Sequence, residues 1–430
     1  MSVKRKIYKF LELSKKRTKK NHKRKRKNKI FISSRYTSVQ NFRIKYEEKV
    51  IKNFKSNLLE YLVDKKFITG FESTNIIITI PDVFCLNSNY KYTIETIKDV
   101  VYSIWINAGK HITIDFSDCT DVGHSALFLL QILRLELQSE FLKLDNRLKT
   151  LTTKTNIEII KSLKSHVNLD LLMCGYIMDD IPIEKHIEPI NTLGYLKGKK
   201  EQKHYLENRK GKNAKSIVDY INNCLKNNLV ELTIDGEKNI LDMVGEILSN
   251  AEDHSPFNTY YVTANYKQFR YDDGSIVGEL YLSFLNFGFS IYEGFLETKD
   301  DNIDLYTSLK NGCDSIKTKI AFSDENLFTL YALQDGVSRL KFKDESRGTG
   351  TMKFINCFFE FGDYFNIEKK HSPNLSILSG KTQLICDNKY KPFNKNGEFF
   401  LSLNDEDDLS EPPSKNHLKD LYYSFRGTVL

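Results

Sequence analysis

Four consecutive segments between residues 75 and 138 alternate between a strand pattern and a helix pattern, and this order limits the fold more than any other feature. The runs "NIIITIP" and "HITIDFS" are short and apolar, as buried strands are. Each is followed by an amphipathic stretch, "YTIETIKDVVYSIWINAG" after the first and "HSALFLLQILRLELQ" after the second. Strand, helix, strand and helix in this order predict a small α/β domain, which we place at residues 75–188.

The second half of the chain, residues 215–430, has another order of patterns. Two helical stretches, "SIVDYINNCLKNN" and "EILSNAEDHS", precede the alternating runs "YYVTANYKQF" and "GELYLSFLNFG". The Asp-Gly turn in "YDDGS" joins these two runs into a predicted β-hairpin. A polar, irregular region follows at residues 297–346, and "RGTGTMKFINCFFEFG" then begins a further amphipathic helix. The Lys- and Gly-rich segment 189–214 predicts a linker between two domains, so the fold class is α/β (α+β).

Positive charge is concentrated at the N-terminus. Residues 1–35 contain 16 Lys or Arg and one acid, a net charge of +15, whereas the remainder carries 48 basic and 55 acidic residues, a net charge of −7. The stretch Lys15 to Lys29 is nearly free of apolar residues, and its self-repulsion favours a flexible arm over a packed fold. We expect the arm, through residues 4–29, to contact nucleic acid or another acidic partner, the alternative being a solvated tail. Residues 36–74 are interpreted as a helical connector.

Composition narrows the class of protein. Hydrophobic residues make up 40% of the 430 residues, which suits a globular protein with a sizeable core. No apolar run approaches the roughly 18 residues of a membrane span, and no apolar segment follows the basic N-terminus as in a secretory signal. The seven cysteines are scattered, with no Cys-x-x-Cys pair or Cys/His cluster at metal-binding spacing. We therefore expect a reduced, cytoplasmic protein that has no structural zinc and no membrane partner.

The stretch "IDFSDCTDVGHSALFLL" resembles the STAS domains of anti-sigma-factor antagonists, in which a strand ending in Asp and Ser leads into a helix with a phosphorylatable Ser. Asp115 and Ser117 match the strand end, and Ser125 falls where the phosphoacceptor would lie. His124 and Ala126 depart from the small residue and glycine of that family. The segment "LLMCGYI" is similar to the closing helix and glycine turn of such domains. A Ser at this position is also a good helix N-cap, so both interpretations of Ser125 stay open.

Glu246 and Asn250 lie four residues apart and therefore share one face of their predicted helix. Alone, they would be a solvent-facing pair. A Gly-x-Gly turn before a helix, as in "RGTGT", lets backbone N–H groups approach a phosphate. With the hairpin between them and the closing "FRGTV", these motifs resemble the GHKL ATPases, a superfamily with gyrase, heat-shock-90 chaperones, MutL-type proteins, histidine kinases and anti-sigma-factor kinases. The resemblance covers roughly residues 205–430.

This resemblance implies a two-layer α/β sandwich with a mixed, mostly antiparallel sheet, a lid around residues 297–346, and ATP and Mg²⁺ as ligands. By position, Glu246 would orient or deprotonate the attacking group, and Asn250 would offer its amide oxygen to Mg²⁺. Ala251 would leave room for the nucleotide. The remaining ATP-binding residues that the resemblance implies are Asn286 and Gly288 at the base, and Arg347, Gly348, Gly350 and Thr351 at the phosphates, with Lys353 near them.

The motif at the adenine site departs from the family pattern. Asn286 stands where the family has an adenine-reading aspartate, and Ser290 replaces a later glycine of the same motif. An Asn carbonyl can still accept a hydrogen bond from the adenine amino group, but its NH₂ then needs another partner. Asp253 and His254 continue the polar end of the helix, and His254 is interpreted as a helix-terminal residue that interacts with the helix dipole.

Three functions remain open. The first is Mg-dependent ATP binding and hydrolysis, in which lid closure regulates a protein partner or a homodimer contact. The second is a serine/threonine protein kinase of the anti-sigma-factor type, acting on a STAS-like partner or on the STAS-like half of its own chain. The third is a nucleic-acid-binding scaffold with a vestigial ATP site. The histidine-kinase alternative is disfavoured because no separate dimerisation helix carries an acidic-flanked His.

Overall fold

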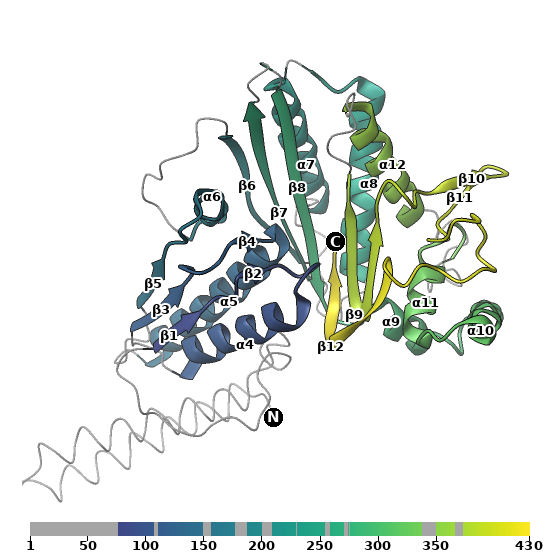
Figure 1. The fold of residues 1–430 in the computed structure, drawn as a ribbon, viewed down its shortest axis with the longest axis horizontal. Helices are drawn as coiled ribbons and strands as arrows, with labels where there is room; N and C mark the ends of the chain where they lie inside the picture. The colour runs from purple at the N-terminus through teal and green to yellow at the C-terminus, as the bar shows by residue number, and fades with distance from the viewer. Residues whose placement is uncertain are drawn as a thin grey trace, which may run out of the picture. The chain divides into compact units, whose positions relative to one another are not determined.

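The computed structural model describes residues 76–106, 111–148, 156–176, 187–199, 209–228, 230–253, 259–270, 274, 276–337, 350–365 and 373–430. Within these ranges the chain is a mixed α/β protein with several sheets, as predicted from the sequence (Figure 1). The predicted basic arm at residues 1–35 and the predicted connector at residues 36–74 lie outside the described residues. All of these described residues belong to one compact unit of the chain.

The predicted alternation of strands and helices near residues 75–188 is present. Three strands pair in parallel in the order β1-β3-β5: β1 Ile76–Thr79, β3 His111–Asp115 and β5 Asn156–Ile160. The accompanying helices are α4 Tyr90–Ile106, α5 His124–Leu148 and α6 Ser165–Met173, and β2 Val83–Phe84 pairs with β4 Asp121–Val122. Apolar side chains such as Ile97, Ile114 and Leu130 are fully buried, so the helices pack on the sheet as the pattern required. We call residues 76–176 the α/β layer.

A five-stranded sheet forms the centre of the second half, in the order β6-β7-β8-β12-β9. Its strands are β6 Ile187–Lys199, β7 Thr259–Arg270, β8 Ile276–Phe287, β9 Leu375–Cys386 and β12 Leu418–Val429. All four pairings are antiparallel, so the expectation of a mixed sheet is wrong. Only β7 and β8 form a local hairpin, the predicted one, and the other pairings join strands that are far apart in the sequence.

The prediction of a linker at residues 189–214 is wrong. The strand β6 occupies Ile187–Lys199, and α7 Arg209–Lys226 begins inside the supposed linker. β6 is an edge strand, where Lys, Gly and Pro are tolerated, and that composition concealed it. Gly198 lies opposite Tyr260, and a Cβ at this glycine would meet the tyrosine ring at 2.0 Å. The glycine is therefore a packing requirement of the strand and not a sign of a loop.

Residues 297–346 are also more regular than predicted. The helices α9 Ile291–Glu297, α10 Ile303–Lys319 and α11 Asp324–Ala332 occupy much of the region, and residues 338–349 lie outside the described part. Along α10 the buried residues are Leu309, Cys313 and Ile316, spaced by four and three positions as on one helical face. The many polar residues around this narrow stripe explain why the sequence suggested an irregular region.

The helices α7 and α8 Ile234–Asp253 pack on one face of the five-stranded sheet, and α12 Gly350–Phe365 packs against α8 (Figure 1). Their apolar side chains, among them Val218, Val244 and Met352, share one core with Phe284 of β8. Successive side chains of a strand point to opposite faces, so Ser283 and Leu285 face the other side of the sheet.

The α/β layer covers this second face. Tyr261, Phe287 and Phe425 are buried there in successive ring contacts, with centroids 5.8 and 6.1 Å apart. Around them the contacts are polar. His124 Nδ1 on α5 lies 3.0 Å from Ser283 Oγ on β8, and the hydroxyl of Tyr423 donates to Glu95 on α4 at 2.5 Å. The sheet thus has buried side chains on both of its faces.

One ion pair between the α/β layer and the sheet is deeply buried. The side chains of Lys267 on β7 and Asp170 on α6 are 10% and 14% exposed and form a direct ion pair. Burial raises the pKa of Asp170, because the cost of desolvation outweighs the attraction of the Lys267 ammonium. We expect Asp170→Leu alone to lower the free energy of unfolding by about 3 kcal/mol, because it leaves a buried ammonium without its partner.

The double variant Asp170→Leu/Lys267→Met tests whether the unpaired ammonium causes this loss of stability. It removes both charges, so we expect it to recover most of the stability that the single variant loses. Urea unfolding followed by circular dichroism measures both values. Equal losses in the single and double variants would contradict this account of the pair.

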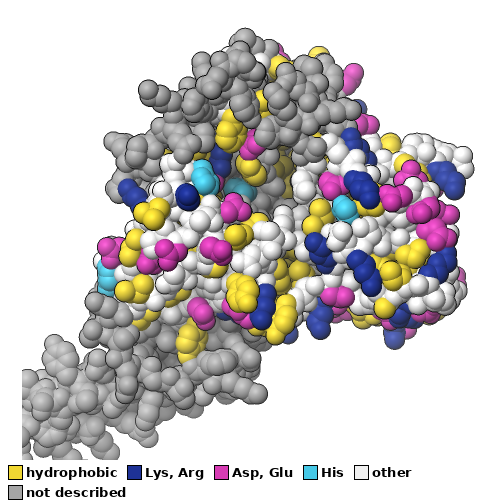
Figure 2. Space-filling view, in the orientation of Figure 1, with side chains coloured by type: hydrophobic (Ala, Val, Ile, Leu, Met, Phe, Trp, Pro, Cys, Tyr) yellow, Lys and Arg dark blue, Asp and Glu magenta, His cyan; other side chains and the backbone are white. Residues whose placement is uncertain are grey.

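Charged side chains of both signs are interspersed on the face shown in Figure 2, so this face carries no large field of one sign. None of the helices in the described part of the chain combines the length and apolar character needed to span a bilayer.

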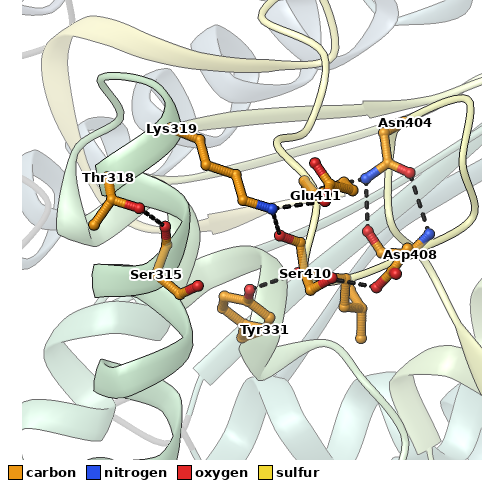
Figure 3. A network of polar contacts seen from close by, with 9 residues as sticks. Ser315, Thr318, Lys319, Tyr331, Asn404, Asp408, Ser410 and Glu411 are labelled. Atoms are coloured by element: carbon orange, nitrogen blue, oxygen red, sulfur yellow. Dashed lines mark hydrogen bonds and ion pairs between the residues drawn. The ribbon is translucent and has the colours of Figure 1, made fainter.

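A polar network fixes the loop at residues 404–411 against α10 and α11 (Figure 3). Lys319 Nζ donates to the Ser410 carbonyl at 2.9 Å and to Glu411 Oε1 at 2.6 Å. The Tyr331 hydroxyl donates to the Leu409 carbonyl at 2.7 Å. The Asn404 side chain closes the loop: it donates to the Asp408 and Glu411 carbonyls and accepts the Asp408 N–H. These bonds join the region before the C-terminal strand to the two helices, although they are some 90 positions apart in sequence.

Candidate functional site

Three motifs that lie far apart in the sequence meet at Asn286, the penultimate residue of β8. Its side-chain nitrogen donates to the backbone carbonyl of Ala251 on α8 at 3.2 Å. Its side-chain oxygen accepts the backbone N–H of Thr428 on β12 at 2.8 Å. Asn286 is only 4% exposed, and these two bonds give its buried amide one donor and one acceptor contact that fix the ends of α8, β8 and β12 against one another.

The close approach of β12 to β8 at this point depends on Gly427. In the sheet register Gly427 lies opposite Phe287, and Thr428 opposite Asn286. Gly427 has a φ of +128°, and a Cβ there would lie 2.0 Å from the Asn286 carbonyl oxygen. A residue with a side chain cannot occupy this position without moving the backbone. The Gly-Thr pair of the closing motif therefore sets the position of Asn286.

Glu246 and Asn250 occupy successive turns of α8, immediately before the Ala251 contact. Both side chains are half-buried. Within the described part of the chain, neither side chain has a hydrogen-bond or ion-pair partner. Among the described residues this carboxylate and this amide, one turn apart on one helix face, are therefore available to a ligand.

Two buried hydroxyl groups complete the end of the sheet and were not identified from the sequence. Ser379 on β9 is fully buried; its Oγ accepts the Ile291 N–H at 2.9 Å and lies 3.0 Å from Thr428 Oγ1. Ser290 caps α9 through a reciprocal pair of bonds with Glu293. This capping explains why a serine stands where the resembled family has glycine. No local pattern marks Ser379, because its partners come from other strands and from α9.

The remaining predicted site residues are only partly described. Gly288 follows β8 with a φ of +154°, a conformation that favours glycine, and it is half-buried. The structure places α12, which begins with Gly350 and Thr351, against α8, the helix that carries Glu246 and Asn250. Arg347, Gly348 and His254 lie outside the described residues.

Ser125, the predicted phosphoacceptor, is the second residue of α5 and lies on the other side of the five-stranded sheet. Its neighbour His124 contacts Ser283, whose side chain faces away from α8. Burial and the nearby Lys267 ammonium lower the pKa of His124 to about 3, so this imidazole is neutral at pH 7. The sheet thus separates Ser125 from Glu246 within one chain.

The donor chemistry at α8 fits a magnesium ion that phosphate groups also hold. Mg²⁺ prefers oxygen ligands, and it is usually bound through one or two protein oxygens plus phosphates and water. The free amide oxygen of Asn250 can supply such a ligand. Among the described residues, no group of three or more His, Cys, Asp or Glu side chains could hold a metal by itself.

Comparison with known proteins does not extend this picture: no protein-family model, no curated protein and no solved structure matches the chain. The chemistry of the site itself is the basis on which its function can be inferred.

Proposed function

We propose that the chain binds Mg·ATP at the end of α8 and hydrolyses it, as a GHKL-type ATPase preceded by a STAS-like layer. The observation that carries this proposal is the convergence at Asn286. The hairpin end is 35 positions from the helix motif and 142 positions from the Gly-Thr strand in sequence, yet two hydrogen bonds of one side chain join all three. This is the arrangement that the resemblance requires around an adenine.

Asn286 can read adenine although it replaces an aspartate. A side-chain amide has two acceptor lone pairs and two N–H donors. The bonds to Thr428 and Ala251 use one of each, so one acceptor and one donor remain. An amide in this state can accept from the adenine amino group and donate to an adjacent ring nitrogen, as Asn does when it reads adenine in DNA. The substitution therefore supports recognition of adenine.

The phosphate end of the site would be formed by α8 and the start of α12. Asn250 would hold the magnesium ion, whose chemistry is to neutralise charge on the phosphates. Glu246, one turn before it, would orient the attacking water and accept its proton. Backbone N–H groups at the N-terminus of α12 would face the phosphates and add the positive end of the helix dipole.

Hydrolysis is favoured here over transfer to Ser125 of the same chain. The sheet lies between α8 and the start of α5, and the α/β layer is held on that far side by buried aromatic and polar contacts. Transfer to Ser125 would therefore need a second copy of the chain or a separate STAS-like partner.

Calorimetric titration with ATP in the presence and absence of Mg²⁺ tests the proposal. We expect saturable binding of ATP that Mg²⁺ strengthens, and weaker binding of GTP, because Asn286 matches the adenine edge. The variant Asn250→Ala should lose the magnesium-dependent part, whereas Asn239→Ala, an exposed residue of the same helix, should bind as the wild type does. Wild-type protein that binds no ATP under either condition would refute the proposal.

A further inference from the structure

A cluster of exposed tyrosines and lysines lies where α4 meets β12. Tyr92 on α4 is 58% exposed and Tyr422 on β12 is 65% exposed, values that are unusual for large aromatic side chains. Lys91 Nζ lies between them, 5.4 Å from the Tyr92 ring centroid and 4.4 Å from that of Tyr422. With Tyr423 and Lys98, these residues form what we call the tyrosine patch.

The patch is held in place by its own contacts. The rings of Tyr422 and Tyr423 meet edge to face at 4.7 Å, and Lys98 Nζ lies 4.3 Å from the Tyr423 ring centroid. The Tyr423 hydroxyl donates to Glu95, so this carboxylate is already engaged. In Figure 2, hydrophobic and Lys or Arg side chains lie next to one another over the region where Figure 1 places α4 and β12. The two most exposed rings are therefore presented to solvent by a rigid base.

Exposed aromatic rings beside ammonium groups suit one ligand class in particular. Proteins bind single-stranded nucleic acid by stacking bases on aromatic rings while cations follow the backbone. Lysine has a long, flexible stem, so the Lys91 ammonium can move from a ring face to a phosphate when a base takes its place. A duplex keeps its bases stacked inside the helix and offers this patch only phosphates.

We propose that the tyrosine patch binds single-stranded nucleic acid, with bases stacked on Tyr92 and Tyr422 and with Lys91 and Lys98 at the phosphates. The basic segment at residues 1–35, with its net charge of +15, supplies an attraction that does not distinguish single from double strands. The patch adds the preference for unpaired bases. This activity is separate from the nucleotide site and does not depend on it.

Fluorescence anisotropy with the full chain tests the proposal. The probes are a labelled single-stranded DNA of about 20 nucleotides, the RNA of the same sequence, and the corresponding DNA duplex. We expect the wild type to bind the single strands more tightly than the duplex. The variant Tyr92→Ala/Tyr422→Ala should lose about tenfold or more in single-strand affinity and change duplex affinity by less than about twofold.

Two controls separate stacking from other effects. The variant Tyr92→Phe/Tyr422→Phe keeps the rings and should bind as the wild type does. Ile303→Ala removes an equally exposed side chain, 55% exposed on α10, and should have no effect. An unchanged single-strand affinity in the double alanine variant, an equal loss on the duplex, or no single-strand binding by the wild type would overturn the proposal.

Discussion

Replacement of Glu246 by Gln is expected to lower the rate of ATP hydrolysis by about a hundredfold or more, with little change in ATP affinity. Gln has the same shape and can still orient a water molecule, but it cannot accept a proton at neutral pH. Loss of a positioned general base typically costs a factor of about 10² to 10⁴. The free state of the Glu246 side chain within the described residues suits this role, because no ion pair would have to break before it acts.

Steady-state phosphate release gives the rate, and calorimetric titration gives the affinity. Asp242→Asn is the matched control, because Asp242 lies one turn earlier on α8, is exposed, and undergoes the same loss of charge. Its rate should stay within about twofold of the wild-type rate. A Glu246→Gln protein that hydrolyses ATP at the wild-type rate would exclude Glu246 as the base, and a parallel loss of affinity would assign it to binding instead.

Replacement of Gly427 by Ala is expected to lower the free energy of unfolding by about 4 kcal/mol and to abolish ATP binding. The new Cβ would lie 2.0 Å from the Asn286 carbonyl oxygen, and the φ of +128° would itself be strained for alanine. The backbone atoms of β8 cannot give way as a flexible side chain could, so β12 must separate from β8. The bond from Thr428 to Asn286 would be lost with this separation.

Gly397→Ala separates the steric clash from the backbone strain. Gly397 also has a positive φ, +90°, but a Cβ there would meet nothing within 4 Å. We expect this variant to lose about 1–2 kcal/mol and to retain ATP binding. Thermal and urea unfolding provide the comparison. Equal losses at the two glycines would show that strain alone, and not the contact with β8, makes Gly427 necessary.

Much of the architecture could be predicted because it follows from local patterns. The strands at residues 76–79 and 111–115, the α4 and α5 helices and the β7–β8 hairpin all have the periodicity of their type. The predictions were wrong for segments whose polar composition is that of a loop although they form a strand or a helix. β6 contains Lys, Gly and Pro because it is an edge strand, and α10 has a narrow apolar stripe because only one face packs.

In the candidate site, too, short sequence motifs could be recognised, whereas contacts between distant parts of the chain could not. The sequence proposed Glu246, Asn250 and Asn286 as candidates, because the order of the short motifs that contain them resembles that of a known family. It could not place Asn286 between Ala251 and Thr428, nor could it identify Ser379, because these contacts depend on strand order. The tyrosine patch was even less accessible to sequence analysis, because Tyr92 and Tyr422 are separated by almost the whole described chain.

The five-stranded sheet has buried side chains on both of its faces, and this limits how the protein can be divided or recombined. A fragment that begins at β6 would carry Tyr261, Phe287 and Phe425 to its surface as an adhesive apolar area. Asn286 and Ser283 are three residues apart on β8 and face opposite sides, so one strand serves both halves. Exchange of either half for a foreign module would therefore also require changes in β8.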